Sequence, residues 1–454
     1  MKKRNLLILG MIFLVTSCNT VTNSESSDKT SSQENNDTPT SSKLLRTPNE
    51  NKENTFGETT TDEYQTFLGK IDDFSAKLSD EYYKTREDNG NITISPLSLY
   101  MGLTLAYSCS ANNTRREILN ALNMTEDEIR KNTEILYRYS NKEVADSEGN
   151  VYSQEKLTNS IWFDYTMENT LISTGLDELA DNYYCYPFSV GFSSNNRNAN
   201  DKIRQFIKEN TNGMIDQDFD LGTETAIALI NTLYFKDTWR FDFEGLSFTD
   251  KIYKFENKNQ TVSNIKLLES SYYGGKAYET ETYRNFYTRT YNGYKLNFIV
   301  PNEGYSISDV FTYDTLKEIS DVKYETINEE KKEKYYTRCL FPEFKASCDD
   351  EVKDVFMNAF GIMDLFNSSA CDFSNITSTN VYCDGIIHVA NVDVNKKGAE
   401  GAAVTIVQTP SSAPGPMPEE YTSVFYDFVV DKNFGVVISD VYGVPLFTTI
   451  VNKL

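Results

Sequence analysis

The sequence predicts one large α+β domain that follows a short apolar leader and a polar linker. Three observations support this fold class: helix signals come first, strand signals follow, and no linker-like composition interrupts residues 62–454. Of 454 residues, 39% are hydrophobic, and 27 Phe and 30 Tyr supply aromatic side chains for a core. A chain with this composition is expected to fold rather than to remain disordered.

The balance of charges excludes several classes of function. The chain carries 44 Lys and Arg against 67 Asp and Glu, a formal net charge of −23. Because nucleic-acid binding relies on cations that neutralise phosphates, we expect no nucleic-acid partner. His388 is the single histidine, which excludes a multi-histidine metal site and leaves one candidate base for Ser-His-Asp chemistry. We therefore expect a protein that is not an enzyme and that holds no metal or other cofactor.

Residues 1–17 have the pattern of an export signal. Basic residues at 2–4 precede an apolar run over 6–15, which is too short to span a bilayer by itself. The run ends in Val-Thr-Ser-Cys at 15–18, which resembles the lipobox of bacterial lipoproteins and implies lipidation at Cys18. An ordinary signal peptide with an incidental cysteine is the alternative. The resemblance implies an extracytoplasmic bacterial protein that is anchored to a membrane, at the cell surface.

Residues 18–61 are expected to form a disordered tether. They are rich in Ser, Thr, Asn, Glu and Asp and have almost no aromatic residues, so they cannot bury enough apolar area to offset chain entropy. The domain beyond the tether contains six further cysteines. No C-x-x-C spacing occurs among them, and buried free thiols are the expected state in a domain of this size.

Local patterns predict the first helices. Apolar residues recur at helical spacing over 64–78. A short strand at 91–94 leads into a second helix, where Ser95 has the properties of an N-cap and Pro96 sits at the first helical position. Capping-box spacing marks two more helix starts, Thr114 with Glu117 and Thr125 with Glu128.

Strand patterns dominate the rest of the domain. Apolar or alternating runs with aromatic and β-branched residues predict strands over 157–165, 226–235 and 295–300. A helix is predicted over 350–360 and is stopped by Gly361. Further strands are predicted over 382–394, 424–430, 436–441 and 447–451, with an irregular stretch over 396–420.

The irregular stretch is unusually long for a compact domain, and such loops are commonly functional. Its first half consists of small residues followed by β-branched ones, so it could become a strand buried on both faces. Its second half contains four prolines, which cannot enter a central strand and should stay extended and exposed.

Several ordered motifs together make the domain resemble a serpin over essentially all of 62–454. The matching segments are Ile94-Ser95-Pro96-Leu97-Ser98, Asn113-Thr114-Arg115, Glu117-Ile118-Leu119, 230–236 with Trp239, Phe341-Pro342-Glu343-Phe344, Leu365-Phe366, Asp372-Phe373-Ser374, His388, and Lys397-Gly398-Ala399-Glu400-Gly401-Ala402-Ala403. The resemblance implies the serpin fold, with several helices, three β-sheets and an exposed reactive-centre loop.

The resemblance also implies a mechanism. A serpin is a metastable fold whose exposed loop is recognised by a protease as a substrate. The protease cleaves the loop and is held at the acyl-enzyme stage. The upstream half of the loop then inserts into the large sheet, and the protease is distorted. The hinge residues must be small for insertion to occur. The hinge expected here consists of Gly398, Ala399, Glu400, Gly401, Ala402 and Ala403, with the Glu400 side chain facing solvent.

The resemblance places the cleaved bond within one residue. The family spacing counted from Gly398 puts cleavage after Ser412, whereas counting back from Phe425 puts it after Ala413. Proline on the leaving-group side hinders most serine proteases, so the Ala413–Pro414 bond is a poor choice, and Ser412–Ala413 is expected to be the reactive bond. A small residue before this bond suits an elastase-like or subtilisin-like protease. A passive linker is the alternative interpretation of this Pro/Ser tract.

Structural roles are expected for the buried polar residues that the resemblance identifies. It places His388 in a buried cluster with Ser95, Ser98 and Asn231, at the point where the large sheet parts, and no pattern supplies His388 with a nucleophile or an orienting acid. Trp239 is expected to pack under the top of the same sheet.

One pair departs from the family pattern. The family usually carries an acid two residues before the hinge glycine, paired with a base after the Phe/Leu-Pro motif, whereas this chain has Lys396 and Glu343 at these positions. We expect the reversed charges to pair; two unrelated solvated charges are the alternative.

The leading hypothesis is therefore a monomeric serine protease inhibitor that acts by covalent trapping and that extends to some papain-like cysteine proteases. The rival is a non-inhibitory protein of the same fold, either a binding protein or a decoy whose loop is simply cut. Ala399 in place of the more usual Thr or Ser, and a loop one residue longer, are the features that favour the rival.

Overall fold

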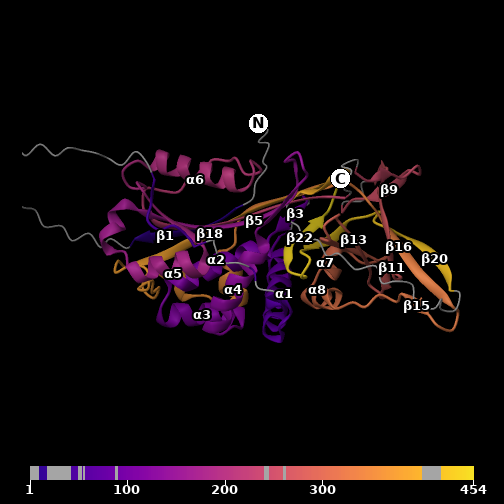
Figure 1. The fold of residues 1–454 in the computed structure, drawn as a ribbon, viewed down its shortest axis with the longest axis horizontal. Coiled ribbons are helices and arrows are strands. Elements are labelled where there is room, and N and C mark those ends of the chain that lie inside the picture. Colours follow the sequence, from indigo (N-terminus) through magenta and orange to yellow (C-terminus); the bar gives the residue numbers. More distant parts are fainter. Residues whose placement is uncertain are drawn as a thin grey trace, which may run out of the picture.

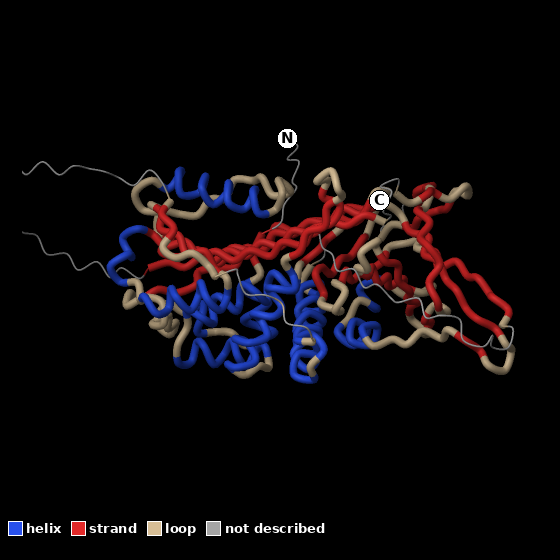
Figure 2. The backbone as a smooth tube through the Cα atoms, viewed as in Figure 1, coloured by secondary structure: helices blue, strands red, loops and turns tan. Residues whose placement is uncertain are grey.

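The computed structural model describes residues 10–17, 42–49, 54, 57–86, 90–239, 245–258, 262–400 and 421–454. In this part of the chain the helices pack mainly on one face of a long sheet, and α6 lies on the opposite face (Figures 1 and 2). The helices are η1 (Glu58–Thr60), α1 (Asp62–Lys84), α2 (Pro96–Cys109), α3 (Asn112–Leu122), α4 (Glu126–Ser140), η2 (Tyr165–Thr170), α5 (Ser173–Tyr183), α6 (Asn196–Asn210), α7 (Ile307–Val310), α8 (Tyr313–Ser320), α9 (Lys353–Phe360) and η3 (Asp364–Phe366).

The largest sheet, called the main sheet here, is built around two long strands, β5 (Val151–Asp164) and β7 (Thr225–Thr238), which pair antiparallel. β18 (Val381–Asn395) lies beyond β7, and two further segments occupy the space between them. The order across the sheet is β1-β18-β19-β7-β5-β6-β2, with β17 on β18 and β4 on β5. The remaining strands are β1 (Gly10–Ser17), β2 (Lys43–Leu44), β4 (Lys142–Ala145), β6 (Cys185–Val190), β17 (Phe344–Glu351) and β19 (Gly398–Glu400).

Two smaller sheets complete the domain. The second sheet has the order β12-β13-β14-β21-β22-β3, and the third has β15-β16-β11-β8 with β20 parallel to β16. Their strands are β3 (Ile92–Ile94), β12 (Tyr278–Glu279), β13 (Tyr283–Arg289), β14 (Lys295–Pro301), β21 (Phe434–Ser439), β22 (Pro445–Val451), β8 (Ser247–Phe248), β11 (Leu268–Gly274), β15 (Ile327–Asn328), β16 (Glu333–Phe341) and β20 (Thr422–Val429), and β9 (Tyr253–Glu256) and β10 (Val262–Ile265) form a separate ribbon.

Helix α2 shows why the core lies between the helices and the main sheet. All its residues from Pro96 to Cys109 are buried, so it is an apolar helix that is packed on every side. Its start follows from local chemistry, because the Ser95 side chain accepts a hydrogen bond from the N–H of Ser98 and Pro96 occupies the first turn. This confirms the predicted cap.

The capping prediction is confirmed at one of the two further sites. Thr125 and Glu128 form a reciprocal capping box at the start of α4. Thr114 does not begin a helix: α3 already starts at Asn112, and the hydroxyl of Thr114 instead accepts the N–H of Asp372. A long-range contact therefore uses the side chain that local spacing assigned to a cap.

The prediction of a disordered tether over residues 18–61 is wrong for residues 42–49 and 57–60. Lys43 and Leu44 pair with β6 at the edge of the main sheet, and the N–H of Leu45 donates to the carbonyl of Pro187 at 2.8 Å. Ion pairs from Lys43 to Glu168 and from Arg46 to Asp177 fix the same segment. Residues 57–60 contain η1. The local composition is polar, but the exposed edge of β6 supplies the backbone partners that the segment lacks by itself.

The six cysteines of the described domain are buried and unpaired, as expected. They are Cys109, Cys185, Cys339, Cys348, Cys371 and Cys383. Among the described helices, none combines the length and the apolar composition that crossing a membrane requires.

Candidate functional site

The predicted hinge begins as a strand inside the main sheet. Gly398, Ala399 and Glu400 form β19, which pairs antiparallel with β18 on one side and β7 on the other. Ala399 is only 1% exposed, and a Cβ on Gly398 would lie 2.1 Å from the carbonyl oxygen of Asp237. Small side chains are therefore required at the first two positions because two neighbouring strands enclose them.

Glu400 differs from its expected orientation. It is half-buried rather than solvated, and its carboxylate accepts a hydrogen bond of 3.1 Å from the hydroxyl of Tyr234 on β7. Burial, together with this carboxylate, raises the pKa of Tyr234, so the hydroxyl keeps its proton and remains a donor. The contact fixes the last described residue of the hinge to β7.

A buried carboxylate holds the end of β7 where the hinge enters. Asp237 pairs with Ala399 in the strand register, and its side chain accepts the N–H of Asn292 at 3.1 Å and the side-chain amide of Asn292 at 2.6 Å. Burial raises the pKa of Asp237 to about 6. Sequence analysis did not identify this pair; the available signal was an acidic residue two positions after an apolar strand pattern and two positions before the tryptophan.

The other predicted residues of the loop and the anchor lie outside the described residues. They are Gly401, Ala402 and Ala403 of the hinge, Ser412 and Ala413 of the reactive bond, and Cys18. The described chain leaves the main sheet at Glu400 and resumes at Tyr421, immediately before β20 of the third sheet. The loop is thus attached at one end to the main sheet and at the other to a different sheet (Figure 1).

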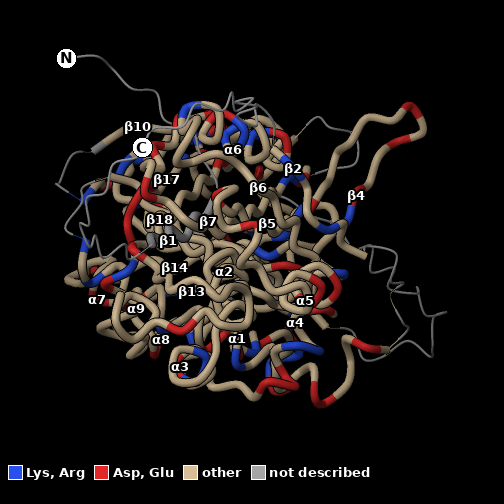
Figure 3. Tube along the Cα trace, turned by 90° about the vertical axis from the view of Figure 1, so that its left-hand side faces the viewer, with Lys and Arg blue, Asp and Glu red and all other residues tan. Residues whose placement is uncertain are grey.

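Beyond the end of β19, the space between β7 and β18 is called the slot here. The slot contains β1. This segment of the predicted leader pairs antiparallel with both strands: Met11 lies opposite His388 of β18 and Asn231 of β7. Figure 3, seen from the end of the molecule, shows β18, β1 and β7 next to one another. The slot therefore accommodates a complete strand with ladder hydrogen bonds on both sides.

The four residues of the predicted buried cluster are joined in one chain of hydrogen bonds through the start of α2, where the N–H of Ser98 donates to the Ser95 side chain at 3.2 Å. The hydroxyl of Ser98 donates to the side-chain oxygen of Asn231 at 2.6 Å, and the N–H of Ser95 donates to Nε2 of His388 at 3.0 Å. Each of the four residues is at most 1% exposed. Because β1 lies between Asn231 on β7 and His388 on β18, these two side chains are connected through Ser98 and Ser95 and not directly across the slot.

Asn159 of β5 completes the pair on the β7 side, and sequence analysis did not identify it. Its side-chain oxygen accepts the amide of Asn231 at 2.8 Å, and its own amide donates to the carbonyl of Tyr183. A buried amide that is fully hydrogen-bonded fixes the position of both strands. A single asparagine within an alternating strand pattern gave too weak a signal to predict this role.

His388 has the environment of a structural residue. Burial lowers its pKa to about 3, so the imidazole is neutral, and Nδ1 has no hydrogen-bond partner within the described part of the chain. A general base needs a pKa near the working pH and a carboxylate or similar group to orient it. The observed contact, from the N-cap of α2, instead connects α2 to β18.

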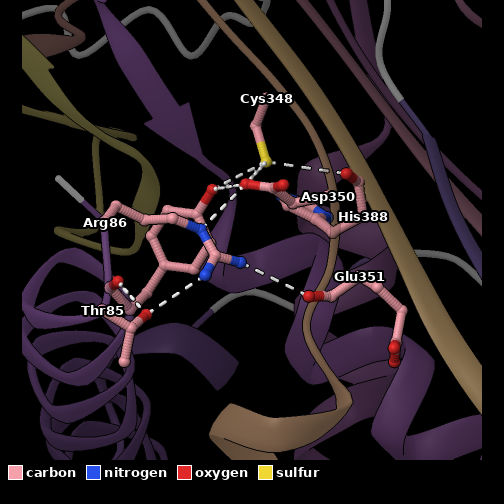
Figure 4. A network of polar contacts seen from close by, with 7 residues as sticks. Thr85, Arg86, Cys348, Asp350, Glu351 and His388 are labelled. Carbon is pink, nitrogen blue, oxygen red and sulfur yellow. Dashed lines mark hydrogen bonds and ion pairs between the residues drawn. The ribbon is translucent and has the colours of Figure 1, made fainter. Parts of the chain in front are cut away.

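A polar network continues from this cluster towards the end of α1 (Figure 4). The thiol of Cys348 on β17 donates to the carbonyl of His388 at 3.6 Å, and the hydroxyl of Tyr82 lies 3.1 Å from the same sulfur. Tyr82 also donates to Asp350, which forms an ion pair with Arg86. Burial raises the pKa of Cys348 to about 12, so the thiol is protonated and the network is structural.

Trp239 and the pair Glu343–Lys396 occupy the top of the main sheet. The Trp239 indole donates to the carbonyl of Asn395 at 2.7 Å and packs edge-on against Phe341, as expected for a packing residue. The expected ion pair is wrong in its form: no ion pair joins the Glu343 and Lys396 side chains among the described residues. The carboxylate instead accepts the backbone N–H of Lys396 at 2.7 Å.

Comparisons with known proteins agree with this geometry. A family model described as "Serpin (serine protease inhibitor)" matches residues 70–453. An uncharacterized serpin-like protein of Methanosarcina acetivorans is 26% identical over 338 residues, 72% of this chain and 74% of that protein. A serine protease inhibitor of Cyanea capillata is 26% identical over 326 residues, 69% of this chain and 82% of that protein.

Solved structures show the same fold. The native state of the thermophilic serpin tengpin aligns with a TM-score of 0.67 at 21% identity, over 91% of this chain and all of that chain. Thyroxine-binding globulin in complex with thyroxine aligns with a TM-score of 0.66 at 18% identity, over 86% of this chain and 99% of that chain. The arrangement of helices and three main sheets is thus that of the expected α+β fold.

Proposed function

Since the chain belongs to the serpin family, we propose that it inhibits serine proteases by covalent trapping, as a monomer whose reactive bond is Ser412–Ala413. The observation that carries the proposal is the position of β19. The hinge has already entered the main sheet between β18 and β7, and its direction continues into the slot.

The strand register indicates which residues of β7 would pair with the loop if the loop inserted into the main sheet. Glu400 lies opposite Lys236 of β7, so a hinge that continued by five residues would place residue 405 opposite Asn231. Met11 of β1 has that position in the structure, and β1 runs in the same direction as β19. The slot therefore has the length and the unpaired backbone groups for the upstream half of the loop when the leader segment is not in it.

The chemistry of trapping assigns distinct tasks to the two sides of the reactive bond. The serine Oγ of the protease bonds to the carbonyl carbon of Ser412, the C–N bond to Ala413 breaks, and the new amino terminus accepts the proton. Release of the downstream half then frees the small-residue segment to enter the slot. The acyl-enzyme is carried along because it is attached to the end of the inserting strand.

The small residue before the reactive bond supports an elastase-like or subtilisin-like target, because Ser412 offers no charge to a trypsin-like pocket. Some papain-like cysteine proteases, whose acyl-enzymes form in the same way, are further targets under this proposal.

The leader pattern supports export, lipidation at Cys18 and display on the surface of a bacterium. Residues 42–49 would then hold the domain close to the end of its tether.

The fold does not imply inhibition by itself. Thyroxine-binding globulin, solved with thyroxine, has the same fold, so a non-inhibitory binding protein or decoy remains the rival. The test is incubation of the chain without residues 1–17 with pancreatic elastase or subtilisin, followed by denaturing electrophoresis and sequencing of the released fragment. A complex that survives SDS and a fragment starting at Ala413 support the proposal. A cleaved chain without any complex supports the rival.

A further inference from the structure

A polar cavity of about 460 Å³ lies among four helices, α2, α3, α4 and α5. These helices gather below the main sheet (Figures 1 and 3), and the residues that line the cavity belong to them rather than to the strands of the slot. All the described residues that line it carry a charged, amide or phenol side chain. The volume lies within the range of small-molecule sites, about 300–1,000 Å³.

Both arginines of the cavity are paired with acids. Nε of Arg115 lies 3.4 Å from a carboxylate oxygen of Glu126, and Arg130 forms an ion pair of 3.1 Å with Asp127. The Asp127 side chain is 91% exposed, so this second pair lies at the mouth of the cavity. Arg115 lies deeper, where it donates to the hydroxyl of Tyr107 at 2.7 Å. Two carboxylates thus balance the two guanidinium groups.

Glu178 on α5 is the third carboxylate of the cavity, and it has no such partner. It is half-buried, and among the described residues no hydrogen bond or ion pair reaches its carboxylate. Burial raises the pKa of Glu178, and the more distant charges of Arg115 and Arg130 offset this only in part. A carboxylate that is withdrawn from water is costly unless a cation or a hydrogen-bond donor compensates it. The cavity therefore carries one negative charge in excess.

Two neutral polar groups of the cavity are also unpaired within the described part of the chain. The hydroxyl of Tyr183 has no hydrogen-bond partner there, although the residue is only 1% exposed. Burial, and then the neighbouring Tyr107 and Glu178, raise the pKa of Tyr183, which places its hydroxyl on the cavity side. Asn182 lies four residues after Glu178 on α5 and so shares its face. Because buried hydroxyls almost always have a partner, the Tyr183 hydroxyl indicates an acceptor supplied by a ligand.

We propose that this cavity binds a small hydroxylated organic monocation, with its ammonium on Glu178 and its hydroxyl oxygens on Tyr183 and Asn182. The excess carboxylate selects one positive charge, and a primary ammonium forms a charge-assisted hydrogen bond with it. A quaternary ammonium is less suited, because such cations are recognised by open aromatic faces. The Arg115 guanidinium lies over the Tyr107 ring, 4.3 Å from its centre. The proposal does not depend on the loop or on protease inhibition.

The test is calorimetric titration of the full chain with three six-carbon polyols that differ in charge: 1-amino-1-deoxysorbitol, sorbitol and gluconate. We expect the amine to bind at least about ten times more tightly than sorbitol, which has the same length and hydroxyl groups but no ammonium. Equal affinity of the amine and sorbitol, or no detectable binding of the amine at about 1 mM, would overturn the proposal. Gluconate that binds as tightly as the amine would also overturn it, because the arginines would then dominate the site.

A substitution at the unpaired carboxylate assigns the affinity to this cavity. Glu178→Gln keeps the shape of the side chain and should weaken binding of the amine at least about tenfold while leaving the affinity for sorbitol unchanged. Glu279→Gln is the matched control: it removes an exposed carboxylate on β12 of the second sheet and should change neither affinity. If Glu178→Gln retains the affinity of the original protein for the amine, the ammonium does not bind here.

Tyr183→Phe tests the hydroxyl contact separately. The variant keeps the buried ring and removes only the unpaired hydroxyl, so the ligand-free protein should melt no lower than the original. Binding of the amine should weaken at least about threefold, because a hydroxyl oxygen of the ligand loses its donor. Unchanged affinity in a variant that melts normally would overturn the assignment of Tyr183 to the site.

Discussion

The carboxylate of Glu343 accepts the backbone N–H of Lys396 at 2.7 Å, two residues before the hinge glycine. The contact connects the start of β17 to the turn between β18 and β19, which is the turn from which the hinge enters the main sheet. The side chain of Lys396 is not needed for it. Although the charges are reversed relative to the family pattern, the top of the main sheet is therefore still linked, by a hydrogen bond between the Glu343 side chain and the backbone of Lys396.

Glu343→Ala is expected to destabilise the native fold by about 0.5–1 kcal/mol, because it removes the acceptor of an exposed hydrogen bond. Lys396→Met keeps the backbone N–H and should leave stability within about 0.5 kcal/mol. The two variants are compared by equilibrium unfolding in urea. An equal loss in both would show that the side chains do form an ion pair in solution.

In the chain without residues 1–17, the proposed function predicts that Ala399→Arg behaves as a substrate rather than as an inhibitor. Ala399 is buried between β18 and β7, so a large charged side chain there obstructs the entry of the strand. Glu400→Arg introduces the same side chain at the neighbouring half-buried position, from which it can extend to solvent, and should keep inhibition. The measurement is the number of inhibitor molecules consumed per elastase molecule inactivated. Similar stoichiometry for both variants would contradict insertion at this register.

Asp237→Asn is expected to change the pH dependence of stability. Burial raises the pKa of Asp237 to about 6, so between its ordinary value near 4 and pH 6 the folded state binds more protons than the unfolded state. The contribution of Asp237 to stability therefore falls as the pH rises through this window, by up to about 2–3 kcal/mol. The asparagine variant does not titrate and should gain stability relative to the original protein between pH 4 and pH 7. A constant difference in the urea midpoints across this range would contradict a raised pKa.

Removal of residues 1–17 should open the slot. In the full chain β1 pairs with both β7 and β18, so the cleaved loop has no free strand positions to occupy. We expect the full chain to be cut by elastase without forming a complex and the shortened chain to form one. A variant with Ile12→Pro in the full chain removes a backbone donor from the centre of β1 and should restore complex formation in part. Equal yields of complex from all three proteins would show that β1 does not compete for the slot.

Local chemistry allowed much of this site to be predicted from the sequence. The small residues at 398–399 follow from a simple limit on side-chain size, and the Ser95-Pro96 cap depends on contacts within a few residues. Both features are as expected. The strands predicted over 226–235 and 382–394 are β7 and β18, each extended by one to three residues at its ends.

Long-range partners account for what could not be predicted. Asn159 meets Asn231, and Asp237 meets Asn292, only because strands and loops far apart in the sequence come together. The same holds for Glu400. The alternation of side chains along the hinge predicts that the Glu400 side chain is exposed, but the hydroxyl of Tyr234, far away in the sequence, donates to its carboxylate. Single-sequence patterns carry no register between distant strands, so these pairings, and the strand formed by β1, were beyond their reach.

The melting temperature of the shortened chain before and after nicking at the reactive bond tests the central claim most directly. Insertion of residues 401–412 would add ladder hydrogen bonds on both sides and bury apolar side chains, so the nicked protein should melt at least about 10 °C above the intact one. An unchanged or lower melting temperature after complete nicking would contradict the account, since no stored energy would then be available to trap a protease.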